Sequence, residues 1–114
     1  MRHAEVVTHA EISAVMDTLF VHRAGALPSQ ALADVFDQLI WCLDDNGAAL
    51  MRVREDWLQS DDLDRVDVAL AMDESFPFAD LTTMDEVFAR ISAKWPHLSQ
   101  RCNSIAAARR ANRG

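Results

Sequence analysis

Closely spaced carboxylates are the first residues in this sequence that could do chemistry. The stretch 61–67 holds four aspartates, and carboxylate oxygens are the ligands that hard cations prefer. The spacing does not fit a calcium loop, because Val66 stands at the fifth position counted from Asp62 and Asp67 stands where such a loop needs glycine. We therefore interpret the stretch as the start of a helix, whose dipole favours negative charge in its first turn.

The other reactive residue types lack the patterns that chemistry requires. No two of the four histidines have the spacing of metal ligands on a helix, and no serine or cysteine stands in a recognisable nucleophile context. Isolated glycines form no phosphate-binding loop, and Cys42 and Cys102 form no disulfide framework. We predict a protein that is not an enzyme and has no catalytic residue, metal or cofactor.

Length and composition indicate one compact globular unit. The chain has 114 residues, half of them apolar, with few glycines and prolines, which is enough for a single core. We expect one helical domain over 1–108 and a frayed basic tail over 109–114. The start of the sequence has no apolar run typical of a signal peptide, and no stretch is long enough to cross a membrane, so we expect a cytoplasmic protein.

The charge is strongly uneven along the chain. There are 18 acidic and 11 basic residues, a net charge of -7, and no acid after Glu86. The region 34–86 carries 15 acids and three arginines, whereas the chain from His97 onward carries four arginines. Such a negative field repels nucleic acid and anionic membranes and accelerates encounter with a basic protein. A basic protein partner is therefore predicted, although excess carboxylates can also serve solubility alone.

Apolar periodicity predicts a mostly α-helical bundle of five to six short helices. Each helix is expected where apolar residues recur at three- and four-residue intervals behind a start signal or before a stop signal. The expected segments run from a capping box at Thr8 to a left-handed cap at Gly25, from Ser29 to Asn46-Gly47, over 50–58, from Ser60 to about 72, from a second capping box at Thr83 to Pro96, and over 98–106.

Two segments also fit β-structure. Asn46-Gly47 has the chemistry of a type I′ hairpin turn, but the residues before it follow the helical period and do not alternate as a half-buried strand does. Val66, Val68, Leu70 and Met72 do alternate. A small β element around 64–72 is thus an open alternative to a fourth helix.

Trp41 is the most informative candidate for binding. At 100° per residue with Leu32 at zero, Trp41 falls at about 180°, opposite the apolar stripe of the second helix. Aspartates at 34, 37, 44 and 45 fall at about 120–220° on the same construction. Exposed tryptophan is enriched at binding hot spots, and the alternative is that another helix covers this face. Phe76-Pro77-Phe78 is a second aromatic candidate, although folding of this loop onto the core is the favoured interpretation.

In size, charge and helix content the chain resembles the immunity proteins of bacterial contact-dependent growth inhibition and colicin systems. That resemblance implies a protein that neutralises a basic nuclease toxin by presenting carboxylates where the phosphates of a nucleic acid would lie. Trp41 would be the anchor. The partner-binding acids would be Asp34, Asp37, Asp44, Asp45, Asp61, Asp62 and Asp64.

Two other binding functions compete with this interpretation. An acidic secretion chaperone would form a dimer and expose an apolar patch, for which Val68 and Met72 are the candidates. An antitoxin or other regulator would mask a basic nucleic-acid-binding surface. The sequence does not separate the regulator from the immunity protein, and it leaves the oligomeric state open.

Overall fold

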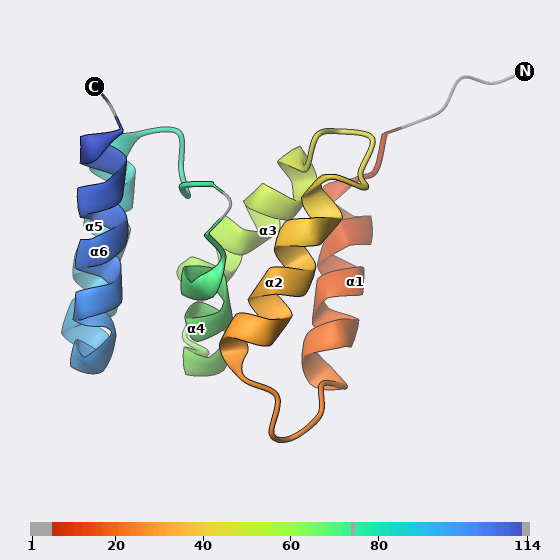
Figure 1. Cartoon of the computed structure of the whole chain (residues 1–114), viewed down its shortest axis with the longest axis horizontal. Coiled ribbons are helices and arrows are strands. Elements are labelled where there is room, and N and C mark those ends of the chain that lie inside the picture. Colours follow the sequence, from red (N-terminus) through yellow and green to blue (C-terminus); the bar gives the residue numbers. More distant parts are fainter. Residues whose placement is uncertain (1–5, 74, 113–114) are drawn as a thin grey trace, which may run out of the picture.

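The computed structural model describes residues 6–73 and 75–112. Within these residues the chain forms helices and no strand (Figure 1). The helices are α1 (His9–Val21), α2 (Ser29–Ile40), α3 (Ala48–Leu58), α4 (Leu63–Ala71), α5 (Leu81–Lys94), a 3₁₀ turn (Pro96–Leu98) and α6 (Ser99–Ala111). The prediction of a mostly α bundle of five to six short helices is confirmed.

The segment for which a strand was the alternative is the helix α4. Asp62 caps it, because its carboxylate accepts hydrogen bonds from the backbone N–H groups of Asp64 and Arg65 at 3.0 and 3.3 Å. Val66 and the whole run from Val68 to Ala71 are buried. An alternating apolar pattern therefore arises here from a helix that is covered on most sides, and not from a half-buried strand.

The helices α1 to α4 surround one core. α1 packs against α3, α3 against α4, and α4 against α2, whereas α1 and α2 pack less closely, although Figure 1 shows them side by side and antiparallel. Trp57 of α3 lies at the centre, with its ring edge-to-face against Phe20 of α1 at 5.3 Å and against Phe36 of α2 at 5.7 Å. These aromatic contacts hold α1 and α2 on the same side of α3.

A buried arginine closes the end of this bundle. The side chain of Arg54 in α3 is 1% exposed, and its guanidinium donates to the carbonyls of Ala69, Met72 and Ser75 at 2.8, 2.5 and 2.7 Å. Desolvation lowers the pKa of Arg54 to about 10, against the opposing effect of the neighbouring acids. The cation satisfies the carbonyls that the end of α4 leaves without helical partners.

Several helix ends differ from the expected ones. The capping box at Thr8 is confirmed, with both reciprocal hydrogen bonds to Glu11. The box expected at Thr83 is wrong, because α5 begins two residues earlier and Asp80 caps it. Gly25 adopts no left-handed conformation, since α1 already ends at Val21.

The Asn46-Gly47 step has the backbone of a primed turn without the strands of a hairpin. Both residues are left-handed, with φ of 59° and 82°, as the Asn-Gly pair allows. The step joins two helices, α2 and α3, and α2 ends at Ile40 and not at this step. The Asn-Gly pair thus correctly predicted a turn. The helical periodicity correctly predicted that the segments on both sides of the turn are helices.

α5 and α6 pack against each other and lie beside α4, on the far side of the molecule from α1 (Figure 1). The expectation of a frayed tail over 109–114 is wrong for the residues described, because α6 continues to Ala111. Arg109 donates to the carbonyls of Pro77, Phe78 and Ala79 at 2.8–3.0 Å. Arg110 pairs with Asp85 at 2.6 Å. These contacts tie α6 to the loop before α5 and to α5 itself.

Candidate protein-binding surface

Trp41 stands in solvent. It follows the last residue of α2, and 72% of its surface is exposed, the largest exposed fraction of any bulky apolar residue described. Its backbone N–H donates to the carbonyl of Gln38 at 3.2 Å, so the backbone of Trp41 is held at the helix end. None of the helices described covers the ring, and the arrangement leaves a large amphipathic ring available to a partner.

Two of the predicted acids are exposed, one in the middle of α2 and one just beyond its end. Asp34 lies two turns before Trp41 and accepts a hydrogen bond from Gln30 at 2.9 Å. Asp44 follows Trp41 by three residues and accepts from the backbone N–H of Val7 at 2.9 Å. That contact places the start of α1 beside the end of α2. Both carboxylates keep free acceptor capacity toward solvent, since each uses one oxygen.

Asp37 was predicted to belong to this acidic surface, and that prediction is wrong. The residue is 4% exposed, and its carboxylate accepts from the backbone N–H of Asp73 at 3.1 Å. Its charge also raises the pKa of the buried Arg54. At about 140° from Leu32 on the helical wheel, Asp37 lies on the flank of α2 that packs against α4. Its negative charge therefore balances a buried cation and is not presented to a partner.

Asp45 is half-buried, and its carboxylate accepts hydrogen bonds from the backbone. Its two carboxylate oxygens accept from the N–H groups of Gly47 and Ala49 at 2.8 and 2.7 Å. It thereby supplies the cap of α3, because the N-cap residue Gly47 has no side chain to do so. The prediction that Asp45 contacts a partner has no support in this arrangement.

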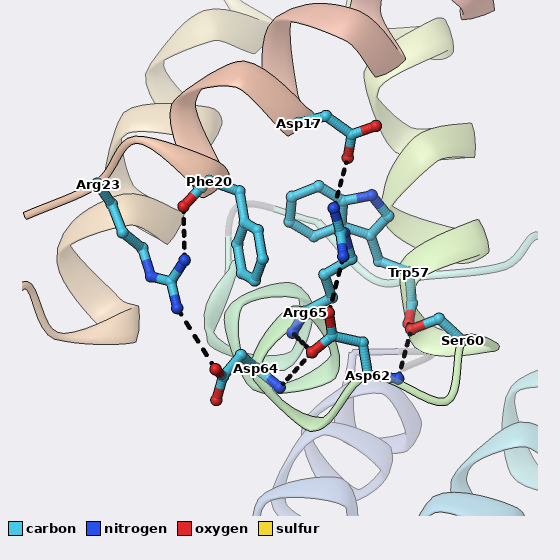
Figure 2. A network of polar contacts seen from close by, with 8 residues as sticks. All are labelled: Asp17, Phe20, Arg23, Trp57, Ser60, Asp62, Asp64 and Arg65. Atoms are coloured by element: carbon cyan, nitrogen blue, oxygen red, sulfur yellow. Dashed lines mark hydrogen bonds and ion pairs between the residues drawn. The ribbon is translucent and has the colours of Figure 1, made fainter. Parts of the chain in front are cut away.

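Asp61, Asp62 and Asp64 lie at the other end of the bundle and are paired within the protein. Asp62 binds Arg65 at 2.7 Å, Asp64 binds Arg23 at 3.4 Å, and Asp61 binds Lys94 at 2.6 Å. The hydrogen bond and charge of Lys94 lower the pKa of Asp61. Figure 2 shows the first two pairs around Phe20 and Trp57.

The length of α2 separates Trp41 from the acids near the start of α4. Its first residue, Ser29, donates to Asp67 of α4 at 2.6 Å, whereas Trp41 follows its last residue. A helix of 12 residues spans about 18 Å. The predicted partner-binding set is therefore divided. Asp61, Asp62 and Asp64 are paired near the start of α4, whereas Asp34, Trp41 and Asp44 are exposed along α2 and just beyond its end.

The sequence analysis missed a concentration of exposed apolar side chains. All the large apolar residues that are exposed lie between residues 6 and 41, and none lies in α3 to α6 as described. They are Val6, Val15, Leu19, Val21, Leu27, Val35 and Trp41. Val15, Leu19 and Val35 follow the apolar period of the first two predicted helices, so periodicity alone predicts that they are buried. On a helical wheel they fall at the edge of the apolar stripe, and that position could have separated them from the buried residues.

The other candidate binding residues are buried, and the described residues form no metal site. Val68 and Met72, the patch expected of a chaperone, are buried, and so are Pro77 and Phe78 of the aromatic loop. Among the residues described, no three His, Cys, Asp or Glu side chains are grouped to hold a metal ion. None of the described helices has the length and apolarity to cross a bilayer. His3 lies outside the described residues.

Comparison of the chain with models of protein families, with curated proteins and with solved structures finds no match. The functional argument accordingly rests on the surface that carries Trp41.

Proposed function

We propose that this protein binds a basic protein partner through Trp41 and neutralises it, and that the partner is a nuclease toxin domain in the cytoplasm of a bacterium. The protein acts as an immunity protein by binding and not by catalysis. Nucleic acid and membranes are not its ligands, because its net charge of -7 repels their phosphates.

The exposure of Trp41 is the observation that carries this proposal. A tryptophan that is 72% exposed leaves a large apolar area in water, and burial of that area in a complex is favourable. Asp34 and Asp44 flank it without a cation partner among the described residues. A protein surface rich in Lys and Arg complements this group, because its cations meet the carboxylates around the aromatic anchor.

Neutralisation follows from the same complementarity. The active surface of a nuclease is basic, because it binds phosphates. A carboxylate surface that competes for those cations blocks access of the nucleic acid without any reaction. The acids at 61, 62 and 64, which already pair with arginine and lysine of this chain, contribute to the long-range field rather than to contacts.

The test is capture of partners with tagged protein from the source organism at low and at moderate salt. We expect one basic protein whose nuclease activity appears only after the two are separated. Trp41→Ala should then weaken that complex about 30-fold or more, as truncation of a hot spot does. Val21→Ala, which also removes exposed apolar surface of α1, is the control and should retain affinity.

Three results would contradict the proposal. Unchanged affinity in Trp41→Ala removes the anchor. Capture of a basic nucleic-acid-binding protein without nuclease activity would assign the protein to the antitoxins and regulators. Capture of unfolded, apolar-rich secreted proteins would assign it to the chaperones.

A further inference from the structure

α1 and α2 each carry exposed apolar side chains. α1 packs closely on α3, and α2 packs closely on α4, but α1 and α2 make little backbone contact with each other. Val15 and Leu19 of α1 are 45% and 39% exposed, and Val35 of α2 is 46% exposed. These three residues, with the half-buried Leu39, are called the α1–α2 seam below.

Helical spacing places the seam residues of α1 on the flank opposite its contact with α4. With Ile12 at zero, the buried Met16 falls at about 40° and Asp17 at about 140°, whereas Val15 and Leu19 fall at about 300° and 340°. Asp17 pairs with Arg65 of α4. Val15 and Leu19 therefore lie on the opposite flank of α1. A shallow depression there is lined by α1 residues alone, which are Ala14, Val15, Thr18 and Leu19.

The same argument holds for α2. With Leu32 at zero, Asp37 falls at about 140°, and Val35 and Leu39 fall at about 300° and 340°. Asp37 accepts a hydrogen bond from the second residue after α4, so Val35 and Leu39 point away from α4. Figure 1 shows α1 and α2 side by side and antiparallel. The seam is thus bordered by apolar side chains from both helices.

The charges beside the seam are acidic. Between residues 6 and 47 there are six acids and one formal cation, Arg23. Arg23 is occupied, because it donates to the carbonyl of Phe20 and pairs with Asp64. Glu11, Asp34 and Asp44 are exposed. A second copy of this chain would bring the same charges opposite each other, which disfavours a self-complementary contact.

We infer that the α1–α2 seam receives an amphipathic helix of the partner, with apolar side chains at three- and four-residue intervals on one face and Lys or Arg at its borders. Exposed apolar side chains on two antiparallel helices form a surface on which the apolar face of such a helix docks. The apolar face covers Val15, Leu19 and Val35, and the basic borders meet Glu11 and Asp34. This inference rests on the proposed function, because it specifies how a basic partner is held in addition to the contact at Trp41.

A synthetic peptide probe tests the seam directly. The probe is a helix of about 18 residues, or five turns, with Leu at helical spacing and Lys elsewhere. Its control has the same composition in scrambled order. Isothermal titration should show one ordered peptide bound per chain, and weaker binding of the scrambled one, because only the ordered peptide presents a continuous apolar face.

Variants of the seam identify where the peptide binds. Val15→Thr with Leu19→Gln should weaken binding of the ordered peptide about tenfold or more, since both side chains lose apolar contact. The matched control Val21→Thr changes an apolar residue that is also exposed on α1 but lies outside the seam, and it should bind as the wild type does. Helix content measured by circular dichroism should be unchanged in all of them, because each altered side chain is exposed.

Two outcomes would overturn the inference. Equal binding of the ordered and scrambled peptides, with no effect of the seam variant, would show that charge alone attracts the peptide. A wild-type dimer in sedimentation that the seam variant converts to a monomer would show that a second copy covers the seam.

The effect of Trp41→Ala on affinity for the captured nuclease tests the proposed function independently of the seam. If that effect is present while the seam variant binds peptide normally, only the inference fails. If Trp41→Ala has no effect while the seam variant loses the peptide, the anchor at Trp41 fails and the seam stands.

Discussion

Arg65 of α4 reaches Asp17 of α1, with a guanidinium nitrogen 3.2 Å from a carboxylate oxygen. The same guanidinium binds Asp62 and lies 4.5 Å from the ring centroid of Phe20 (Figure 2). One cation thus joins two helices and rests on the aromatic core. Arg65 thus neutralises acids at this end of the bundle from within the protein, whereas the exposed Asp34 and Asp44 have no cation partner among the described residues.

The first prediction concerns this arginine. Arg65→Gln should lower the free energy of unfolding by about 1–2 kcal/mol, because it removes a half-buried ion pair and a cation–π contact. Urea denaturation measures the effect. Arg90→Gln removes the same charge from an exposed position and should change stability by less than about 0.5 kcal/mol. Equal effects of the two variants would mean that only net charge matters.

The second prediction compares two pairs of acids with the same total charge. Asp34→Asn with Asp44→Asn should slow association with a basic partner about threefold or more at low salt, because both carboxylates are exposed beside Trp41. Asp61→Asn with Asp64→Asn alters net charge equally, but these carboxylates already pair with Lys94 and Arg23. Stopped-flow association rates should separate the two pairs. Identical slowing would mean that the partner responds to the overall field.

Much of the fold could be predicted because most of its helices are amphipathic. The stripe of α2 was visible in the sequence, and Leu32 and Phe36 are buried as its period requires. Helix ends were less predictable, since several residues near each end could cap. Asp80, and not Thr83, caps α5, and the sequence contained plausible signals at both positions.

The candidate site was only partly predictable, because charge and periodicity do not show which acids are already paired. The wheel correctly placed Trp41 opposite the core. It could not reveal that Arg54 is buried beside Asp37, or that Arg23 reaches Asp64 from the end of another helix. Val15 shows the same limitation for apolar residues, since a residue at the edge of a stripe is buried only if a neighbouring helix covers it.

The third prediction uses two glycines. Gly47 has φ of 82°, and an added Cβ would lie 2.7 Å from Cγ2 of Ile40. Gly47→Ala should therefore cost about 1–3 kcal/mol of stability through backbone strain and the clash. Gly25 has open space around its Cα, and Gly25→Ala should be neutral or stabilise by about 0.4–1 kcal/mol by restricting the unfolded chain. Thermal unfolding of the two variants checks the contrast, and a similar loss in both would contradict it.

The fourth prediction is the pH dependence of the cap at Asp80. Hydrogen bonds from the Thr83 hydroxyl and backbone N–H, at 2.8 and 3.0 Å, lower the pKa of Asp80 below its ordinary value of 3.8. Because the folded state holds this proton less tightly than the unfolded state, the contribution to stability is complete above pH 3.8 and is lost as the pH falls through the lowered pKa.

Asp80→Ala should therefore reduce stability at neutral pH, and its difference from the wild type should shrink as the pH falls below 3.8. Asp80→Asn is the matched variant, because it keeps an acceptor for Thr83 but does not titrate. The difference in unfolding free energy between Asp80→Asn and the wild type should also shrink as the pH falls below 3.8, because the wild-type carboxylate loses its charge there. Urea denaturation at a series of pH values measures both, and a pH-independent difference for Asp80→Ala would show that the ionised carboxylate does not stabilise the start of α5.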